Sequence, residues 1–241
     1  MFTVAICALG ASGDDEARAL ASDLGSGVYE TRLKLAQPPP IVVLRTHDEA
    51  AAALLARTLR ARGHDAVALD EGAVPEPFVV RTFHLGDTSF DCEGGSLPYG
   101  DVLALVRGAL TLKTETVDRV TERKLRPGAA LVTGGLILSK KVTREEKRVA
   151  HDREDLLYVF RSAGGAPWLV SEHGAVYASL PSVAPTQREN FLRVASELRA
   201  RAPAATWDER LLAHRGVEDR SILDLRAQIL AIAIARSRTY R

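Results

Sequence analysis

Three apolar runs and three amphipathic segments alternate along residues 1–74. The apolar runs are short and uncharged, which predicts buried strands. In the segments between them, apolar residues recur every three or four positions, which predicts helices with one buried face. Strands are expected at 2–9, 41–44 and 66–69, and helices at 14–24, 28–36 and 50–59. The predicted order is therefore βααβαβ.

Between residues 78 and 170 the pattern favours strands. Short apolar or alternating runs are separated by glycine pairs and prolines, which are typical of turns. A helix that begins at Pro185 then carries one apolar face. Strands are expected at 78–85, 88–92, 102–112, 156–160 and 167–170, with a further one at 174–177, and the helix face consists of Phe191, Leu192, Val194, Ala195 and Leu198.

These patterns predict an α+β fold. The segment 70–77 holds two prolines and several acids and is expected to be a linker. We therefore expect a βααβαβ domain over 1–74, a β-rich domain over 77–204 with a long insert at 113–153, and a helical tail over 205–241.

The tail predicts a C-terminal helix over residues 217–237. Apolar residues cover most of its circumference, so the helix must be buried. It is expected to pack on its own domain or against a second copy of the chain, as a homodimer. A position on a membrane surface, with arginines among the headgroups, is the alternative. Those arginines are Arg226, Arg236, Arg238 and Arg241.

Composition places few limits on function. The chain has 241 residues, of which 46% are hydrophobic and 26% charged, and its formal net charge is +1. A globular protein is expected, without an overall bias toward nucleic acid or membranes. Only 5% of residues are aromatic and they do not alternate with basic ones, so nucleic-acid binding is not expected.

The cysteines and the N-terminus favour a cytoplasmic location. The two cysteines, Cys7 and Cys92, lie far apart in apolar or strand-like contexts and form neither a zinc motif nor a disulfide framework. The first residues lack the basic start of a signal peptide, and no run is long enough to predict a membrane-spanning helix.

The insert combines an apolar centre with basic flanks. Residues 113–153 contain eleven Lys or Arg and six Asp or Glu, while residues 129–138 carry no charge. The insert is expected to be a long hairpin that continues the sheet, a contact for another protein, or a contact for an anionic membrane. The residues expected to meet a partner or membrane are Arg123, Lys124, Arg126, Leu131, Leu136, Ile137, Lys140 and Lys141.

The N-terminal segment resembles a family of protein-binding domains. The resemblance rests on three stretches of sequence: the segment SGVYETRLKLA, the strand that follows it, and the closing AAAALLARTLRARGHDAVAL. These resemble the C-terminal domain of the bacterial ribosomal stalk protein and the related adaptor of the Clp protease, over residues 2–71. The resemblance implies a βααβαβ fold that binds protein partners without catalysis.

The second domain resembles a bacterial pleckstrin-homology-like domain. The resemblance rests on the segments LPYGDVLALVRG, DLLYVF at 155–160 and the closing helix TQRENFLRVASELRARAP. In the first of these, a strand is expected to carry a surface-directed Arg107. The resemblance covers residues 77–204 and implies a non-enzymatic binding module. It carries over no ligand residue.

No cluster in the sequence predicts an active site, a cofactor or a metal centre. The segment HDRED, residues 151–155, would place His151 and Asp155 one turn apart if it were helical, but a charged turn before a strand is the expected structure. If the protein were an enzyme with a site between its domains, His151, Asp152 and Glu172 would be the first candidates.

The function expected from the sequence is therefore non-catalytic. We expect a binding, adaptor or scaffold protein that acts through contacts with protein partners whose identity is open. Peripheral binding to an anionic membrane through residues 123–148 is the first alternative. An unrecognised enzyme is the second.

Overall fold

The computed structural model of the protein describes residues 1–10, 13–125, 139–214 and 216–239, and between 113 and 151 it describes only the backbone of the strands. The expected α+β class is confirmed, because the described residues form three sheets and five α-helices. The chain divides into two compact units, residues 1–110 with 154–241, and residues 111–153. The domain boundary expected near residues 74–77 falls within the first unit and stays a prediction.

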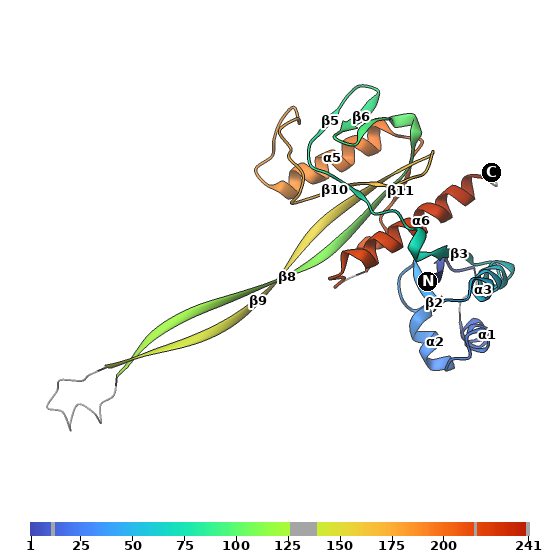
Figure 1. Ribbon diagram of the computed structural model, residues 1–241, viewed down its shortest axis with the longest axis horizontal. Helices are drawn as coiled ribbons and strands as arrows, with labels where there is room; N and C mark the ends of the chain where they lie inside the picture. Colours follow the sequence, from blue (N-terminus) through green and yellow to red (C-terminus); the bar gives the residue numbers. More distant parts are fainter. Residues whose placement is uncertain (11–12, 126–138, 215, 240–241) are drawn as a thin grey trace. The chain divides into compact units, whose positions relative to one another are not determined.

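The N-terminal segment forms a three-stranded antiparallel sheet in the order β2-β1-β3 (Figure 1). Its elements follow the predicted order: β1 Phe2–Ala8, α1 Asp14–Leu24, α2 Val28–Leu35, β2 Ile41–Thr46, α3 Glu49–Ala61 and β3 Asp65–Asp70. Helix α3 begins where predicted because the Asp48 carboxylate accepts a 3.0 Å hydrogen bond from the Ala51 N–H. Buried Val4, Ile6, Leu20 and Leu59 lie in its core.

The rest of the first unit is built on two further sheets. One has the order β11-β8-β9-β10-β4 and the other β5-β6-β7, and helix α5 covers their common core. The strands are β4 Phe78–Val80, β5 Phe83–Leu85, β6 Ser89–Cys92, β7 Gly95–Pro98, β8 Val102–Leu125, β9 Ser139–Arg161, β10 Trp168–Ser171 and β11 Thr206–Asp208, and the helices are α5 Gln187–Arg201, η1 Glu71–Ala73, η2 Tyr99–Asp101 and η3 Arg210–Ala213.

Three local predictions in this region were wrong. The strand expected at 78–85 is divided because Thr82 donates its N–H to Glu93 and the Arg81 carbonyl accepts from Val176 at 2.7 Å. Residues 174–177 form no strand of their own, and only the isolated bridge between Thr82 and Val176 remains. On α5, Leu192 is 37% exposed and lies outside the buried face.

Helix α6, Arg220–Thr239, packs against its own chain. It contacts β1, β3 and η3, and Arg236 donates to the Ala66 carbonyl at 2.7 Å and pairs with Asp65. Tyr158 donates to the Asp224 carboxylate at 2.7 Å. The apolar surface on which a homodimer or a membrane-surface helix was expected is therefore largely buried within the chain itself.

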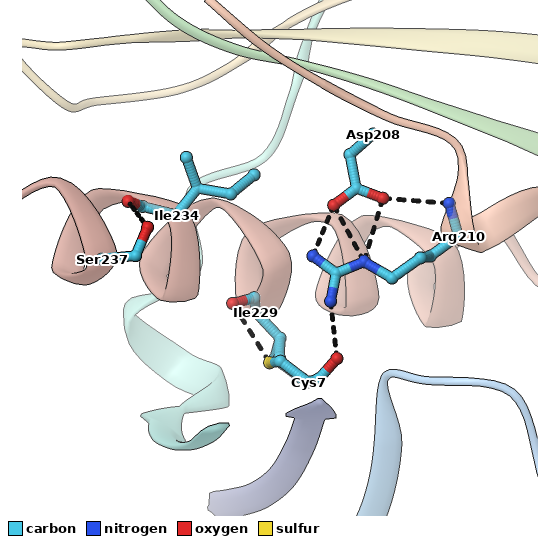
Figure 2. Close-up of polar contacts among 6 residues, drawn as sticks. All are labelled: Cys7, Asp208, Arg210, Ile229, Ile234 and Ser237. Atoms are coloured by element: carbon cyan, nitrogen blue, oxygen red, sulfur yellow. Dashed lines mark hydrogen bonds and ion pairs between the residues drawn. The ribbon is translucent and has the colours of Figure 1, made fainter. Parts of the chain in front are cut away.

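Figure 2 shows how the end of β1 is held between α6 and the segment after β11. Arg210 bonds the Asp208 carboxylate through Nε and Nη2, and its Nη1 donates to the Cys7 carbonyl at 2.5 Å. The Cys7 thiol lies 3.9 Å from the Ile229 carbonyl oxygen. Burial raises the pKa of this thiol to about 12, and Cys7 is completely buried, so its role here is in packing.

Candidate functional site

The expected contact residues fall on the second unit. The backbone of residues 111–125 in β8 and 139–153 in β9 forms two paired strands, which we call the β8–β9 ribbon (Figure 1). Arg123 and Lys124 lie on β8, and Lys140 and Lys141 lie on β9, at positions where only the backbone is described. Arg126, Leu131, Leu136 and Ile137 lie outside the described residues.

Two further strands border β8 and β9 only at their inner parts. Strand β11 pairs with β8 over Ala104–Val106, and β10 pairs with β9 over Leu156–Val159. Along the ribbon, each strand has only the other as its neighbour within the part of the chain that the structure describes. Among the described strands, the outer edges of the ribbon therefore carry backbone N–H and C=O groups that no further strand pairs with.

A buried ion cluster lies where β8 and β9 belong to the first unit. Arg107 on β8 donates to the Asp155 carboxylate on β9 at 2.6 Å and to Glu209 at 3.1 Å. The Asp155 side chain is fully buried, and that of Arg107 is 15% exposed. Such a pair is costly to desolvate, and removing one member leaves a buried charge with less compensation. The cluster therefore fixes β8 against β9.

A second carboxylate extends this cluster. Buried Glu172, just after β10, accepts a 3.1 Å hydrogen bond from the Asp155 N–H, and its own N–H donates to the Asp155 carbonyl at 2.9 Å. The Arg107 guanidinium also lies 6.0 Å from the centre of the Phe191 ring on α5. The cluster thus ties β8, β9, β10 and α5 together.

This arrangement corrects the expectation for Arg107. A surface-directed arginine was expected on this strand, but the side chain is turned toward Asp155 and is mostly buried. The physical reason is the buried carboxylate of Asp155, which the Arg107 guanidinium stabilises through a charge-assisted hydrogen bond. Gly108, next along β8, has room for no larger residue without adjustment, because a Cβ there would lie 3.3 Å from the Leu211 side chain.

The residues proposed for an enzyme have different settings. His151 and Asp152 lie on strand β9, so the one-turn helical spacing considered for His151 and Asp155 does not exist, and the turn expected there is wrong as well. Asp152 is exposed, whereas Glu172 is buried in the ion cluster. Among the described residues there is no group of three His, Cys, Asp or Glu side chains able to hold a metal ion.

One cavity of about 410 Å³ lies among β2, the segment 71–77 and the start of α6, and it is lined by several carboxylates. Glu71 pairs with Arg45 at 3.1 Å, and Asp224 accepts from Tyr158. Asp219 accepts from the Ser221 N–H at 2.9 Å as the cap of α6. Burial is the largest cause of the raised pKa of Asp224, and the charges of nearby acids raise this pKa further. These three carboxylates thus have structural partners.

His64 and the two tryptophans, Trp168 and Trp207, make structural contacts. The His64 side chain is completely buried, with its Nε2 atom 3.0 Å from the Glu16 carboxylate and its Nδ1 atom 3.2 Å from the Gly10 N–H. Trp168 lies in the core, 5.7 Å from the Phe90 ring, and Trp207 lies under the Arg199 guanidinium. These contacts stabilise packing.

Comparison of the chain with protein-family models, with curated proteins and with solved structures found no match. The resemblances to the stalk-protein and pleckstrin-homology-like domains therefore stay predictions. No helix in the described part of the chain is long and apolar enough to cross a membrane.

Proposed function

We propose that this protein is a non-catalytic binding protein of the adaptor or scaffold kind, acting in the cytoplasm, and that the β8–β9 ribbon is its contact element. One observation supports this most directly: residues 111–153 form a compact unit of their own, while the two hydrophobic cores found among the described side chains lie in the other unit. An isolated pair of strands is only marginally stable in water. A binding partner is a physical reason for a chain to maintain one.

The chemistry of the ribbon favours a protein partner with an acidic surface. The insert carries eleven basic and six acidic residues, interspersed along both strands. Charges of both signs oppose edge-to-edge aggregation of the ribbon with itself. A partner strand added to an open edge would gain backbone hydrogen bonds, and complementary charges would fix its register.

An anionic membrane is the second candidate. The uncharged residues 129–138 between Arg126 and Lys140 favour it, because apolar side chains flanked by cations suit the boundary between acyl chains and headgroups. Each basic residue near such a surface contributes about 1 kcal/mol of binding free energy. The acidic residues Glu122, Glu145 and Glu146 oppose this candidate.

The test compares the full chain with two variants. In the first, Asn-Gly replaces residues 113–151. This variant keeps the inner ends of both strands, where the Ser162 N–H donates to the Asp101 carbonyl at 2.8 Å. In the second, K140E and K141E are combined. The matched control combines R18E and R57E, which reverse two exposed charges on α1 and α3.

Photo-cross-linking from ribbon positions, followed by mass spectrometry, names a partner, and binding is then measured with that partner purified. We expect both ribbon variants to lose the binding and the control to keep it. Equal binding by the shortened variant would overturn the proposal. Salt-sensitive co-sedimentation with anionic but not neutral vesicles, lost in K140E/K141E, would establish the membrane candidate instead.

A further inference from the structure

A second cavity, of about 510 Å³, lies in the first unit among the loop after α2, the segment after η3, and α6. Its lining combines apolar side chains with a few polar groups, of which His214 and Arg226 have unusual settings. Gln37, Glu218, Asp219 and Ile222 also line it. A cavity of this size with convergent polar groups is the general form of a small-ligand site.

His214 presents a nitrogen without a partner. The residue is only 8% exposed, and the backbone carbonyl of Pro39 acts to raise the pKa of its imidazole. Its Nε2 atom is buried and has no hydrogen-bond partner in the described part of the chain. Burial, and then the charge of Arg226, lower the pKa of this imidazole.

Arg226 is a half-buried cation with no carboxylate to balance it among the described residues. Its Nε atom is buried and lacks an acceptor. Burial lowers the pKa of this guanidinium, and the charge of Arg45 lowers it further. Because a desolvated guanidinium is costly, arginines at such positions are normally paired.

The acids on the cavity wall are engaged elsewhere. Asp219 accepts from both the N–H and the hydroxyl of Ser221, at 2.9 and 2.7 Å. Glu218 also has an interaction of its own. Both are exposed residues, whereas the unpartnered nitrogens of His214 and Arg226 are buried. The cavity wall thus holds an arginine without a carboxylate partner in the described part of the chain, while its exposed acids disfavour ligands of high negative charge.

We propose that this cavity binds an oxyanion group, a carboxylate or a phosphate, between Arg226 and His214. One oxygen accepts from the guanidinium of Arg226. Another accepts from the imidazole of His214, which takes up a proton from solvent on binding. The ligand supplies the negative charge that Arg226 lacks, and the protonated imidazole supplies the second donor, in a charge-assisted pair.

Proton uptake makes the affinity of the site depend on pH. If His214 is neutral in the empty cavity and protonated in the complex, affinity rises as pH falls, by up to about tenfold per pH unit. The charged groups that bear on the imidazole are Arg226 on α6, Glu218 and Asp219 on the preceding segment, and Arg45 through Arg226. A purely electrostatic attraction to Arg226 would lack this dependence.

The experiment titrates the full-length protein with acetate and, separately, with inorganic phosphate, at constant ionic strength, at pH 6 and pH 7.5. Calorimetry reports affinity and, in buffers of different ionisation enthalpy, the number of protons taken up. The ¹⁵N shifts of the histidine side chains report the protonation of His214, assigned with H214Q. R226Q removes the guanidinium, and R18Q on exposed α1 is the control.

We expect saturable binding of at least one probe, tighter at pH 6, with proton uptake and with His214 as the histidine that titrates. Acetate alone would identify a carboxylate ligand and phosphate alone a phosphate ligand. R226Q should lose the binding and R18Q keep it. The proposal is overturned if neither probe binds the wild-type protein, or if binding proceeds without proton uptake at His214. These readouts on the wild-type protein hold even if H214Q folds poorly.

Discussion

Arg107 is mostly buried and Arg226 is half-buried, and the settings of these two cations differ. Arg107 contacts two carboxylates and an aromatic ring, and it joins two strands. Arg226 lines a cavity and, in the described part of the chain, has no carboxylate partner. Arg107 has a structural role, because its two carboxylate partners offset the free energy of removing its charge from water. In the second setting, no carboxylate among the described residues offsets the desolvation of the guanidinium, which fits our proposal that Arg226 binds an anionic ligand.

The largest expected effect on stability comes from removing the ion pair between Arg107 and Asp155. R107M should destabilise the protein by about 3–5 kcal/mol, because it removes the guanidinium from a fully buried Asp155 carboxylate. Urea unfolding followed by circular dichroism measures it. The double variant R107M/D155L should recover much of the loss. A double variant no more stable than R107M would show that packing, and not the charge pair, dominates at this position.

An intermediate effect is expected at the pair that holds α6 to β3. R236M removes both the pairing with Asp65 and the 2.7 Å bond to the Ala66 carbonyl. Asp65 is 35% exposed, so solvent screens the charge pair, and the expected loss is about 1 kcal/mol. The same unfolding assay applies. A loss as large as that of R107M would mean that exposure does not distinguish the two pairs.

R226M should change the stability of the ligand-free protein by less than about 0.5 kcal/mol, or raise it. The reason is that the variant removes a desolvated charge without leaving a buried carboxylate behind. Thermal and urea unfolding in chloride salts would measure the change. A loss of several kcal/mol would show that Arg226 has a structural role and would remove the contrast with Arg107.

The smallest effect is a pH dependence. The pKa of His214 in the folded protein lies below its ordinary value of 6.5, so the unfolded chain binds more protons below that pH. The contribution of His214 to stability is therefore complete above about pH 6.5 and is lost as pH falls toward the folded pKa. H214Q should lose less stability than the wild type between pH 7.5 and pH 5.5. Parallel curves from urea unfolding at each pH would contradict this.

The sequence predicted elements better than contacts. The three strands and three helices of the N-terminal sheet follow from apolar runs and from the Asp48 cap, because local periodicity reports burial of a face. The division at residues 81–82 was missed, since it depends on bonds from Glu93 and Val176, which are distant in sequence. The burial of α6 was predicted, although its partners β1 and β3 were not.

The ion cluster and the second cavity were missed for a related reason. Arg107, Asp155 and Glu172 stand far apart along the chain and form no spacing motif. The one local signal was charge within otherwise apolar strands, as in VLALVRGAL, where an arginine interrupts a buried run. His214 and Arg226 carry no such signal, because a histidine near a turn and an arginine on a helix are ordinary. Only the fold shows that their nitrogens lack acceptors.

The packing of α6 on β1 and β3 has a consequence for synthesis of the protein. The ribosome makes the N-terminal sheet early, but Asp65 meets Arg236 across 171 residues of chain, and Cys7 meets Ile229 across 222. One face of that sheet thus stays uncovered through most of translation. Exposed apolar surface of this kind is what chaperones recognise in nascent chains. The nascent protein is therefore expected to depend on such protection until α6 has left the exit tunnel.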